Sequence, residues 1–186
     1  MKKLLTLSMI ILFALPSVMA QEDEAKEESD FGRNNISLFM SDIIMKRVTF
    51  EYEHIVGDNG NMSINVPISV AVGETYDVYD DVVDWWVGLG MKLYPTGQGT
   101  IRYFFGPEVR IISARSTYTV NNDGFSQEFD EELIHSAFLL NNGMIYEPTE
   151  HFIFTVSMGL GFVSRDSKDS GFYPMATPSV RMGFRF

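Results

Sequence analysis

The residues that could form a hydrolytic site lie in one short stretch of the sequence. His135 is followed by Ser136 and preceded by Glu131 and Glu132. A hydrolytic serine needs a histidine within hydrogen-bonding reach, and that histidine needs a carboxylate to orient it. Adjacent residues on a β-strand point to opposite faces of the sheet, so His135 is not expected to activate Ser136. The sequence therefore predicts no catalytic residue.

Acidic residues gather in two stretches that could attract divalent cations. They are Glu74, Asp77, Asp80, Asp81 and Asp84 in the first stretch, and Asp123, Glu128, Asp130, Glu131 and Glu132 in the second. Neither stretch has the Asp-x-Asp-x-Asp-Gly spacing of a calcium loop. The chain also has no cysteine, which excludes a disulfide framework and a thiolate metal site. We expect solvated loop charge, with no metal and no cofactor.

The amino-terminal residues read as a targeting segment. Residues 1–20 combine a basic start (Lys2 and Lys3), an apolar run over 4–15 and a small-residue exit that ends at Ala20. This order is typical of a cleaved secretory signal peptide. The apolar run is also shorter than the roughly 20 residues that a membrane helix needs. We therefore expect cleavage after Ala20.

Charge sets limits on the partners of the remaining chain. Residues 21–33 form an acidic segment without apolar periodicity, which predicts a mobile spacer. The whole chain has 14 Lys and Arg against 25 Asp and Glu, a formal net charge of −11. A protein that binds nucleic acid presents a basic patch, and no basic cluster is present here. Nucleic acid is not an expected partner.

From Asn34 onward, apolar residues alternate with polar or small ones, which is the period-two pattern of β-strands. No helical run interrupts the alternation. We expect eight strands, over residues 35–43, 47–53, 62–72, 85–94, 100–114, 133–146, 151–163 and 179–186. Short turns follow the second, fourth and sixth strands, and long polar connections follow the third, fifth and seventh, over residues 73–84, 115–132 and 164–176. The first connection, residues 41–46, is short.

The two faces of these strands differ in character. In 151–163, one face carries large apolar side chains, namely Phe152, Phe154, Val156, Met158 and Leu160. The other face of the strands carries charges of both signs among glycines: Glu51, Glu53, Lys92, Arg102, Glu108, Arg110, Arg181 and Arg185, with Gly88, Gly90, Gly159 and Gly161. A soluble barrel turns its apolar face inward, whereas a membrane barrel turns it outward to lipid. Alternation alone leaves both arrangements open.

Aromatic residues near the strand ends favour the membrane arrangement. They are Tyr94, Tyr103, Tyr146 and Phe152 beside the short turns, and Trp85 and Trp86 beside a long connection. Two separated aromatic belts are typical of membrane barrels. We interpret the eight strands as an antiparallel up-and-down transmembrane barrel with an apolar outer face.

The end of the chain carries the most specific pattern. Met182, Phe184 and Phe186 alternate up to a terminal aromatic, which resembles the carboxy-terminal signal of bacterial outer-membrane barrels. With the signal peptide and the loop pattern, residues 34–186 resemble small eight-stranded barrels of the OmpX and OmpA type. That resemblance implies the outer membrane of a Gram-negative bacterium, both termini in the periplasm, and recognition by the barrel assembly machinery. No peptidoglycan-binding domain follows residue 186, so a cell-wall tether is not expected.

Eight strands enclose an interior just wide enough for side chains to fill. We expect the inward charges to meet across the lumen as one network that closes it, formed by Glu51, Glu53, Glu108, Arg110 and Arg181. The leading hypothesis is a non-enzymatic barrel with a structural or surface-interaction role, whose outer loops contact lipopolysaccharide or an external partner. The alternatives are a lipid-modifying enzyme and a small-solute passage protein.

Overall fold

The computed structural model describes residues 32–57, 60–73, 82–122, 125–165 and 171–186, and the side chains of these residues except 117–130. The chain divides into two units, Met1–Asp30 and Phe31–Phe186. The first unit lies outside the described residues. The expected signal peptide and nearly all of the acidic segment fall there.

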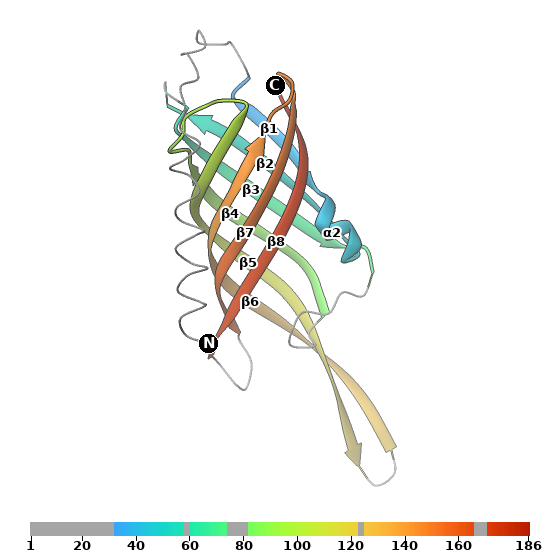
Figure 1. Ribbon diagram of the computed structural model, residues 1–186. Helices are drawn as coiled ribbons and strands as arrows, with labels where there is room; N and C mark the ends of the chain where they lie inside the picture. The colour runs from blue at the N-terminus through green and yellow to red at the C-terminus, as the bar shows by residue number, and fades with distance from the viewer. Residues whose placement is uncertain (1–31, 58–59, 74–81, 123–124, 166–170) are drawn as a thin grey trace, which may run out of the picture. The chain divides into compact units, whose positions relative to one another are not determined.

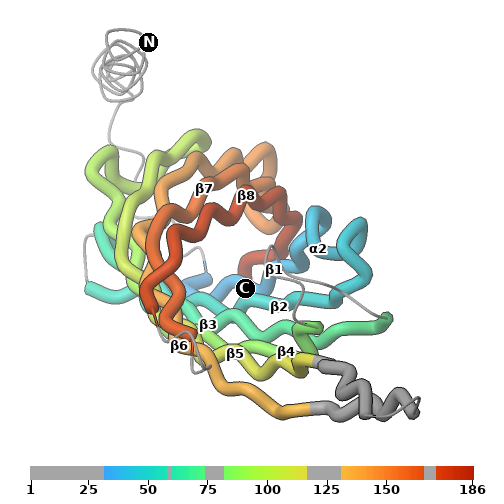
Figure 2. Tube along the Cα trace, turned by 90° about the horizontal axis from the view of Figure 1, so that it is seen from below, coloured from blue at the N-terminus to red at the C-terminus, as the bar shows by residue number. Residues whose placement is uncertain are grey.

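The second unit is a closed antiparallel barrel of eight strands, as the sequence predicted. The strands are β1 (Asn34–Phe39), β2 (Arg47–Val56), β3 (Met62–Ala71), β4 (Val82–Leu93), β5 (Ile101–Asn122), β6 (Phe125–Tyr146), β7 (Phe152–Arg165) and β8 (Gly171–Arg185). Each strand pairs with the next in sequence, and β8 pairs with β1 to close the ring (Figures 1 and 2). Closure leaves no sheet edge exposed along most of the wall.

The short turns lie at one end of the barrel, together with the start of β1 and the end of β8. Gly57 and Gly97 adopt positive φ angles of 84° and 71° in two of these turns, a conformation that glycine adopts without steric cost. The N–H of Asn34 donates to the carbonyl oxygen of Phe186 at 3.1 Å. We call this the short-turn end and the opposite end the far end.

The first strand ends earlier than the sequence predicted. β1 stops at Phe39, and residues Met40–Ile44 form a short helix, α2, where we expected strand up to residue 43 and no helix. Met40, Ile43 and Ile44 have the i, i+3, i+4 spacing of a helical apolar face, a signal that the strand interpretation overlooked. The helix ends at Ile44, and Lys46, two residues later, has a φ of 55°.

The fifth and sixth strands extend well into the expected loop at 115–132. They pair with each other from Ile101↔Tyr146 to Asn122↔Phe125, whereas their pairing with β4 and β7 stops at Arg115 and Ser136. The remainder is a two-stranded ribbon (Figure 1). In the described pairing, this part of β5 and β6 has no third strand beside it, and its polar sequence lacks the period-two pattern, which explains why it resembled a loop. β8 likewise begins at Gly171, inside the expected connection at 164–176.

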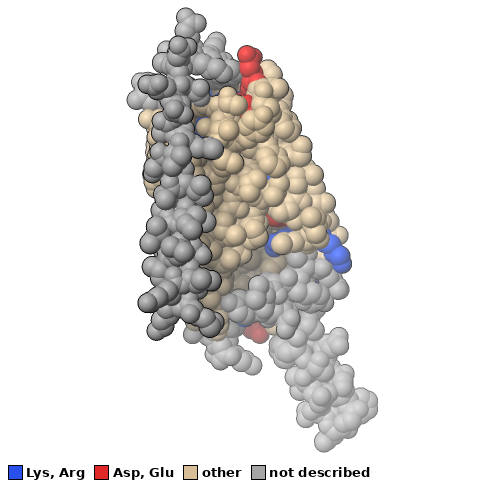
Figure 3. All heavy atoms as spheres, in the orientation of Figure 1, with Lys and Arg blue, Asp and Glu red and all other residues tan. Residues whose placement is uncertain are grey.

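The barrel is apolar outside and charged inside. The five apolar residues singled out on β7 lie on its outer face; Phe152, Val156, Met158 and Leu160 are exposed and Phe154 is half-buried. The eight charged residues of the opposite face are all buried. Few charged atoms interrupt the described surface in Figure 3. No helix in the described part of the chain is long and apolar enough to cross a membrane.

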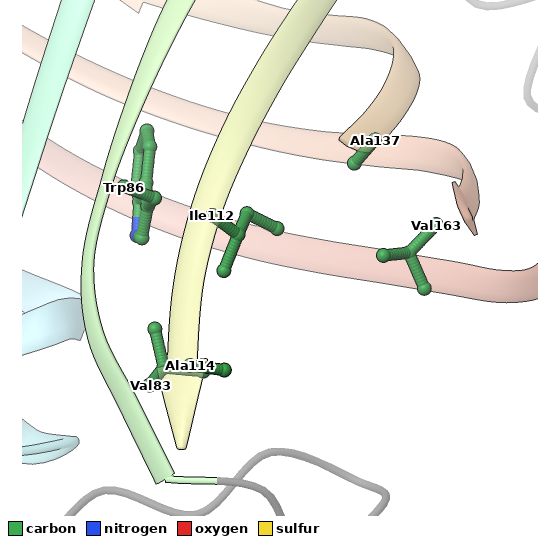
Figure 4. Packing of buried hydrophobic residues seen from close by; sticks show 6 residues of the cluster. All are labelled: Val83, Trp86, Ile112, Ala114, Ala137 and Val163. Atoms are coloured by element: carbon green, nitrogen blue, oxygen red, sulfur yellow. The ribbon is translucent and has the colours of Figure 1, made fainter. Parts of the chain in front are cut away.

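The interior is not uniformly polar, whereas we expected the inward side chains to form a polar lumen. Toward the far end, six buried side chains from β4, β5, β6 and β7 pack together inside the wall: Val83, Trp86, Ile112, Ala114, Ala137 and Val163 (Figure 4). We call them the inner apolar cluster. Trp86 and Tyr94, which we assigned to outer aromatic belts, are both buried inside. Trp85 and Trp86 are neighbours on one strand and so must face opposite sides.

Candidate functional site

The densest set of buried charges lies in the lumen between β2, β4 and β8. Glu51 and Glu53 are successive inward residues of β2, Lys92 is on β4, and Arg181 is on β8. All four are buried. We call them the central charge network. The two carboxylates and two cations give the network no net charge. Burying a charged side chain costs free energy unless it is paired and hydrogen-bonded, and all four side chains here have partners of opposite charge.

Glu51 is the hub of this network. Its carboxylate accepts hydrogen bonds from Lys92 Nζ at 2.7 Å and from Arg181 Nη1 at 2.7 and 2.8 Å. Asn65 Nδ2, from β3, donates a further bond at 2.9 Å. A Cβ atom on Gly90 would come within 2.6 Å of Asn65 Oδ1. The absence of a side chain at Gly90 therefore makes room for the amide that orients Glu51.

The Glu53 carboxylate accepts hydrogen bonds from the same cation, Lys92, and from two hydroxyl groups. Lys92 Nζ donates to Glu53 at 2.8 Å, so one ammonium group bridges both carboxylates of β2. Ser63 Oγ donates at 2.6 Å, and the Tyr94 hydroxyl also donates to Glu53 Oε1. Charge-assisted hydrogen bonds of this kind are roughly twice as strong as neutral ones. The carboxylate is thus fixed in position from three directions.

Arg181 connects the network to β7 and to aromatic rings. Its Nη2 donates to Ser157 Oγ at 2.6 Å, and its Nε donates to Ser179 Oγ at 3.2 Å. The guanidinium carbon lies 4.6 Å from the ring centroid of Phe39. A planar cation suits a site that requires both directional donation and contact with a ring.

A separate ion pair, between Glu108 and Arg110 on β5, lies outside the central charge network. Arg110 Nε donates to Glu108 Oε1 at 2.5 Å, and Asn141 Nδ2 donates to Glu108 Oε2 at 2.8 Å. The Arg110 guanidinium carbon lies 4.0 Å from the ring centroid of Trp86, where the inner apolar cluster begins. The structure therefore brings Glu51, Glu53 and Arg181 together, and it places Glu108 and Arg110 in a separate pair. We had expected one network of all five.

A third set of interacting polar side chains lies in the lumen at the short-turn end. The sequence analysis did not predict it. Glu147 accepts from Arg102 Nη2 at 2.7 Å and from Arg185 Nη1 at 3.0 and 3.1 Å. Gln98 Oε1 accepts from Arg185 Nη2 at 3.0 Å and also from Arg102 Nη1. Glu147 lies directly after β6, in the short turn that the sequence predicted after residue 146. The available signal was a pair of inward arginines at strand ends that needed a carboxylate.

Lys92 was also missing from the expected network, although it was recognised as inward. Its position was readable from the sequence, because it follows Gly88 and Gly90 at intervals of two on the same face of the strand. What the sequence could not supply was the register between β2 and β4, which are separated by β3. That register brings one ammonium group within reach of both carboxylates.

The remaining candidate residues lie on the outer surface or apart from one another. Met182, Phe184 and Phe186 are exposed on the outer side of the closing strand. His135 is buried inside, whereas Ser136 is exposed on the other face, so the two do not form a hydrolytic pair. Within the described residues, no group of three or more His, Asp or Glu side chains is placed to hold a metal ion. Most of the acidic residues of the expected loops lie outside the described side chains.

Chemically, the lumen presents paired charges and packed apolar side chains in layers. From the short-turn end, the inward residues of β5 are Arg102, Phe104, Glu108, Arg110, Ile112 and Ala114. The charged members of this series all have carboxylate or amide partners. The arrangement is suited to holding the cross-section of the barrel fixed.

No protein-family model matches the sequence, and no curated protein matches it. Among solved structures, the N-terminal β-barrel domain of Pseudomonas aeruginosa OprF is similar, with a TM-score of 0.53 and 12% identity over 82% of this chain and 96% of that one. The Yersinia pestis outer membrane protein Ail, solved in a phospholipid bilayer nanodisc, gives a TM-score of 0.43 and 11% identity over 83% of this chain and 99% of that one. The likeness to OprF shows a shared barrel fold. At the level of fold, the resemblance to small eight-stranded outer-membrane barrels is confirmed.

Proposed function

We propose that the chain is a non-enzymatic outer-membrane β-barrel with a structural or surface-interaction role, whose lumen is closed by its own side chains. In this proposal the strands span the outer membrane of a Gram-negative bacterium. Both termini lie in the periplasm at the short-turn end, after export and cleavage of residues 1–20.

The observation that carries the proposal is the inversion of polarity between the two faces of the wall. Large apolar side chains are exposed on every strand, for example Phe50 on β2, Val109 on β5 and Leu160 on β7. In water a continuous apolar surface of this extent is unfavourable, whereas lipid solvates it. Inside, Glu51 and Arg181 are buried and paired. A soluble barrel would reverse this arrangement.

The side chains that fill the interior support a role other than solute passage. The central charge network, the Glu108–Arg110 pair and the inner apolar cluster follow one another along the interior. Eight-stranded barrels have little room beyond that taken by such side chains. The ribbon of β5 and β6 beyond the wall supports a surface-interaction role, since at the far end it would project outside the cell, toward lipopolysaccharide or an external partner.

Density fractionation of a Gram-negative host that expresses the full chain tests the proposal. We expect the protein in the outer-membrane fraction, with a gel mobility that changes on heating. Phe186→Ala should lower this level strongly, because it removes the terminal aromatic that the assembly machinery would recognise. Phe172→Ala is the matched control, since Phe172 is an exposed aromatic at the other end of β8. Recovery of the unchanged chain in the soluble periplasm would refute the membrane assignment, and normal levels of Phe186→Ala would count heavily against it.

A further inference from the structure

The short helix α2 exposes apolar side chains on the outside of the barrel. Met40, Ile43, Ile44 and Met45 are exposed, and Ile44 is 87% exposed. The one buried residue of the helix is Asp42. A helix on a water-soluble protein turns its apolar side to the core and its charges to solvent. The polarity of α2 is the reverse, which matches the inverted polarity of the strands.

The strand that precedes α2 is too short to cross a membrane by itself. β1 has six residues, whereas a transmembrane strand needs about 9 to 11. At about 3.3 Å per residue and a tilt near 40°, six residues rise roughly 15 Å, against an apolar band of about 25 Å. If the short-turn end lies at one membrane interface, α2 lies inside the apolar band and not above it.

α2 borders a part of the barrel wall where strand pairing stops. Described pairing between β1 and β8 runs from Asn35↔Arg185 to Phe39↔Arg181, although β8 begins at Gly171. The next contact is made by the helix, because the Val180 N–H donates to Ser41 Oγ at 3.4 Å. Backbone groups in lipid must be satisfied within the protein. The helical turn meets part of this requirement, because the Met45 and Lys46 N–H groups donate to the carbonyl oxygens of Asp42 and Ile43, and Ser41 supplies an acceptor to the neighbouring strand.

The sequence of β8 fits a strand with one open edge in this region. Pro178 lies two residues before Val180. Proline lacks the N–H donor and is confined within sheets to edges and strand starts. Figures 1 and 2 show α2 beside β8 and β2, in agreement with the contacts of the helix.

Polar contacts on the inner side fix which face of α2 points outward. Thr49 Oγ1 donates to Asp42 Oδ2 at 2.6 Å. At the end of the helix, the Val72 N–H donates to the Lys46 carbonyl oxygen at 2.9 Å, which ties the turn to the end of β3. With Asp42 held inward from β2, Ile43 and Ile44 are directed away from the lumen.

We propose that α2 is a lipid-contacting part of the barrel wall, and that Ile43, Ile44 and Met45 insert among the acyl chains of the surrounding membrane where β1 does not reach. The inference rests on the proposed membrane location. It commits to acyl chains as the occupant because the segments beside α2 also expose apolar side chains, namely Phe50 on β2 and Val72, whose N–H donates to Lys46. Lys46, exposed directly after this surface, marks the polar boundary, and its long side chain can reach the headgroups.

Spin labels on single cysteines test this directly, because the chain has no native cysteine. Ile44→Cys is labelled with a nitroxide in the full chain folded into phosphatidylcholine vesicles, and its collisions with oxygen and with a water-soluble nickel complex are measured. Val109→Cys, on the outer face of β5, is the lipid reference, and Glu150→Cys, in an exposed turn, is the water reference. We expect the oxygen-to-nickel ratio at position 44 to match position 109 and to exceed position 150 several-fold.

Each other outcome contradicts the inference in a distinguishable way. A ratio at position 44 equal to that at 150, with position 109 still in lipid, places α2 in water and overturns the inference while the membrane barrel stands. Low accessibility to both reagents at position 44 places protein on this surface, such as a second copy of the chain, and also overturns it. Ratios typical of water at both 44 and 109 refute the proposed function itself. Ile43→Cys provides an independent measurement on the same face if Ile44→Cys does not fold.

Discussion

The central charge network and the inner apolar cluster lie inside the same wall and fill it by different chemistry. In the network, Glu51, Glu53, Lys92 and Arg181 make contacts of 2.7 to 2.8 Å across the lumen. In the cluster, side chains from β4 to β7 pack without polar contacts between them. The two regions adjoin where the Arg110 guanidinium lies 4.0 Å from the Trp86 ring centroid.

The difference lies in what each region requires of its members. A charge network requires every partner, because one removed residue leaves an opposite charge buried without compensation. An apolar cluster requires volume, because a smaller residue leaves a cavity. Partner loss should therefore be the more severe defect, and restoring charge balance should relieve it. In the cluster, relief requires restoring the lost volume.

The largest effect is expected for Arg181→Ala. The substitution leaves Glu51 with Lys92 and Asn65 but without its second cation, and breaking a buried pair in this way costs on the order of 3 to 5 kcal/mol. Lumen water would reduce the loss. Unfolding in lipid vesicles, followed by the gel-mobility difference between folded and heated forms, measures it. The same protein should conduct more ions than the native form in planar bilayers, because its lumen has lost a crossing side chain.

The double variant Arg181→Ala with Glu51→Ala isolates the pairing itself. If the two residues depend on each other, the double variant should lose clearly less stability than the sum of the two single losses. Strictly additive losses, together with steady conductance by the native protein, would mean that the network does not close the lumen. Solute passage would then become the better account of the function.

A smaller effect is expected for Ile112→Ala in the inner apolar cluster. Truncating a buried isoleucine costs about 2 to 5 kcal/mol, depending on how far the cavity collapses. Ile111→Ala is the matched control, because Ile111 is the next residue of β5 and is exposed on the outer face. Lipid should fill the space left at position 111, so its loss should be the smaller of the two in the same unfolding assay. Equal losses would contradict the assignment of inner and outer faces.

A charge placed on the outer face should cost less again and should depend on depth. Met158→Arg, near the middle of β7, is expected to destabilise the barrel by about 2 to 4 kcal/mol. Phe172→Arg, at the far end of β8, should cost only about 0 to 1 kcal/mol, because it lies near the membrane interface. Unfolding in vesicles of one lipid composition compares the two. An equal cost at both positions would argue against a membrane-spanning wall.

The smallest effect is expected for the ion pair on the rim. Arg115 Nη2 lies 2.6 Å from Asp84 Oδ1, but the two side chains are 48% and 30% exposed. Exposed pairs contribute about 0 to 1 kcal/mol because solvent screens them. Arg115→Ala should therefore leave the unfolding transition nearly unchanged. A loss as large as that of Arg181→Ala would show that burial does not distinguish the two pairs.

Much of the fold was readable from the sequence because the barrel obeys a period of two. Alternation separates the face that carries Lys92 from the face that carries Val156, and the aromatic and carboxy-terminal patterns then assigned the first face to the inside and the second to the outside. An even number of antiparallel strands also makes β1 and β8 antiparallel, so that they can pair and close the barrel. The strand ends were harder to predict. β5 and β6 continue to pair with each other through polar sequence that lacks the period-two pattern, so alternation could not predict where these strands end.

The contacts of the lumen were not readable in the same way. Alternation shows that a charge points inward but does not show its height or its partner. Arg181 and Glu51 meet only because β8 and β2 are staggered on either side of β1. Glu108 and Arg110, two residues apart on one strand, pair locally. Asp42 was missed because α2 was expected to be a strand.

The central claim is that the apolar face of the wall lies in lipid and the polar face lies in the lumen. Adjacent positions of β7 test it most directly, since Val156 is exposed outside and Ser157 is buried beside Arg181. Val156→Cys and Ser157→Cys are each labelled with a nitroxide in phosphatidylcholine vesicles. The rates at which oxygen dissolved in the lipid collides with the two spin labels are then compared. We predict strong oxygen accessibility at 156 and little at 157. Greater lipid exposure at 157 than at 156 would contradict the account.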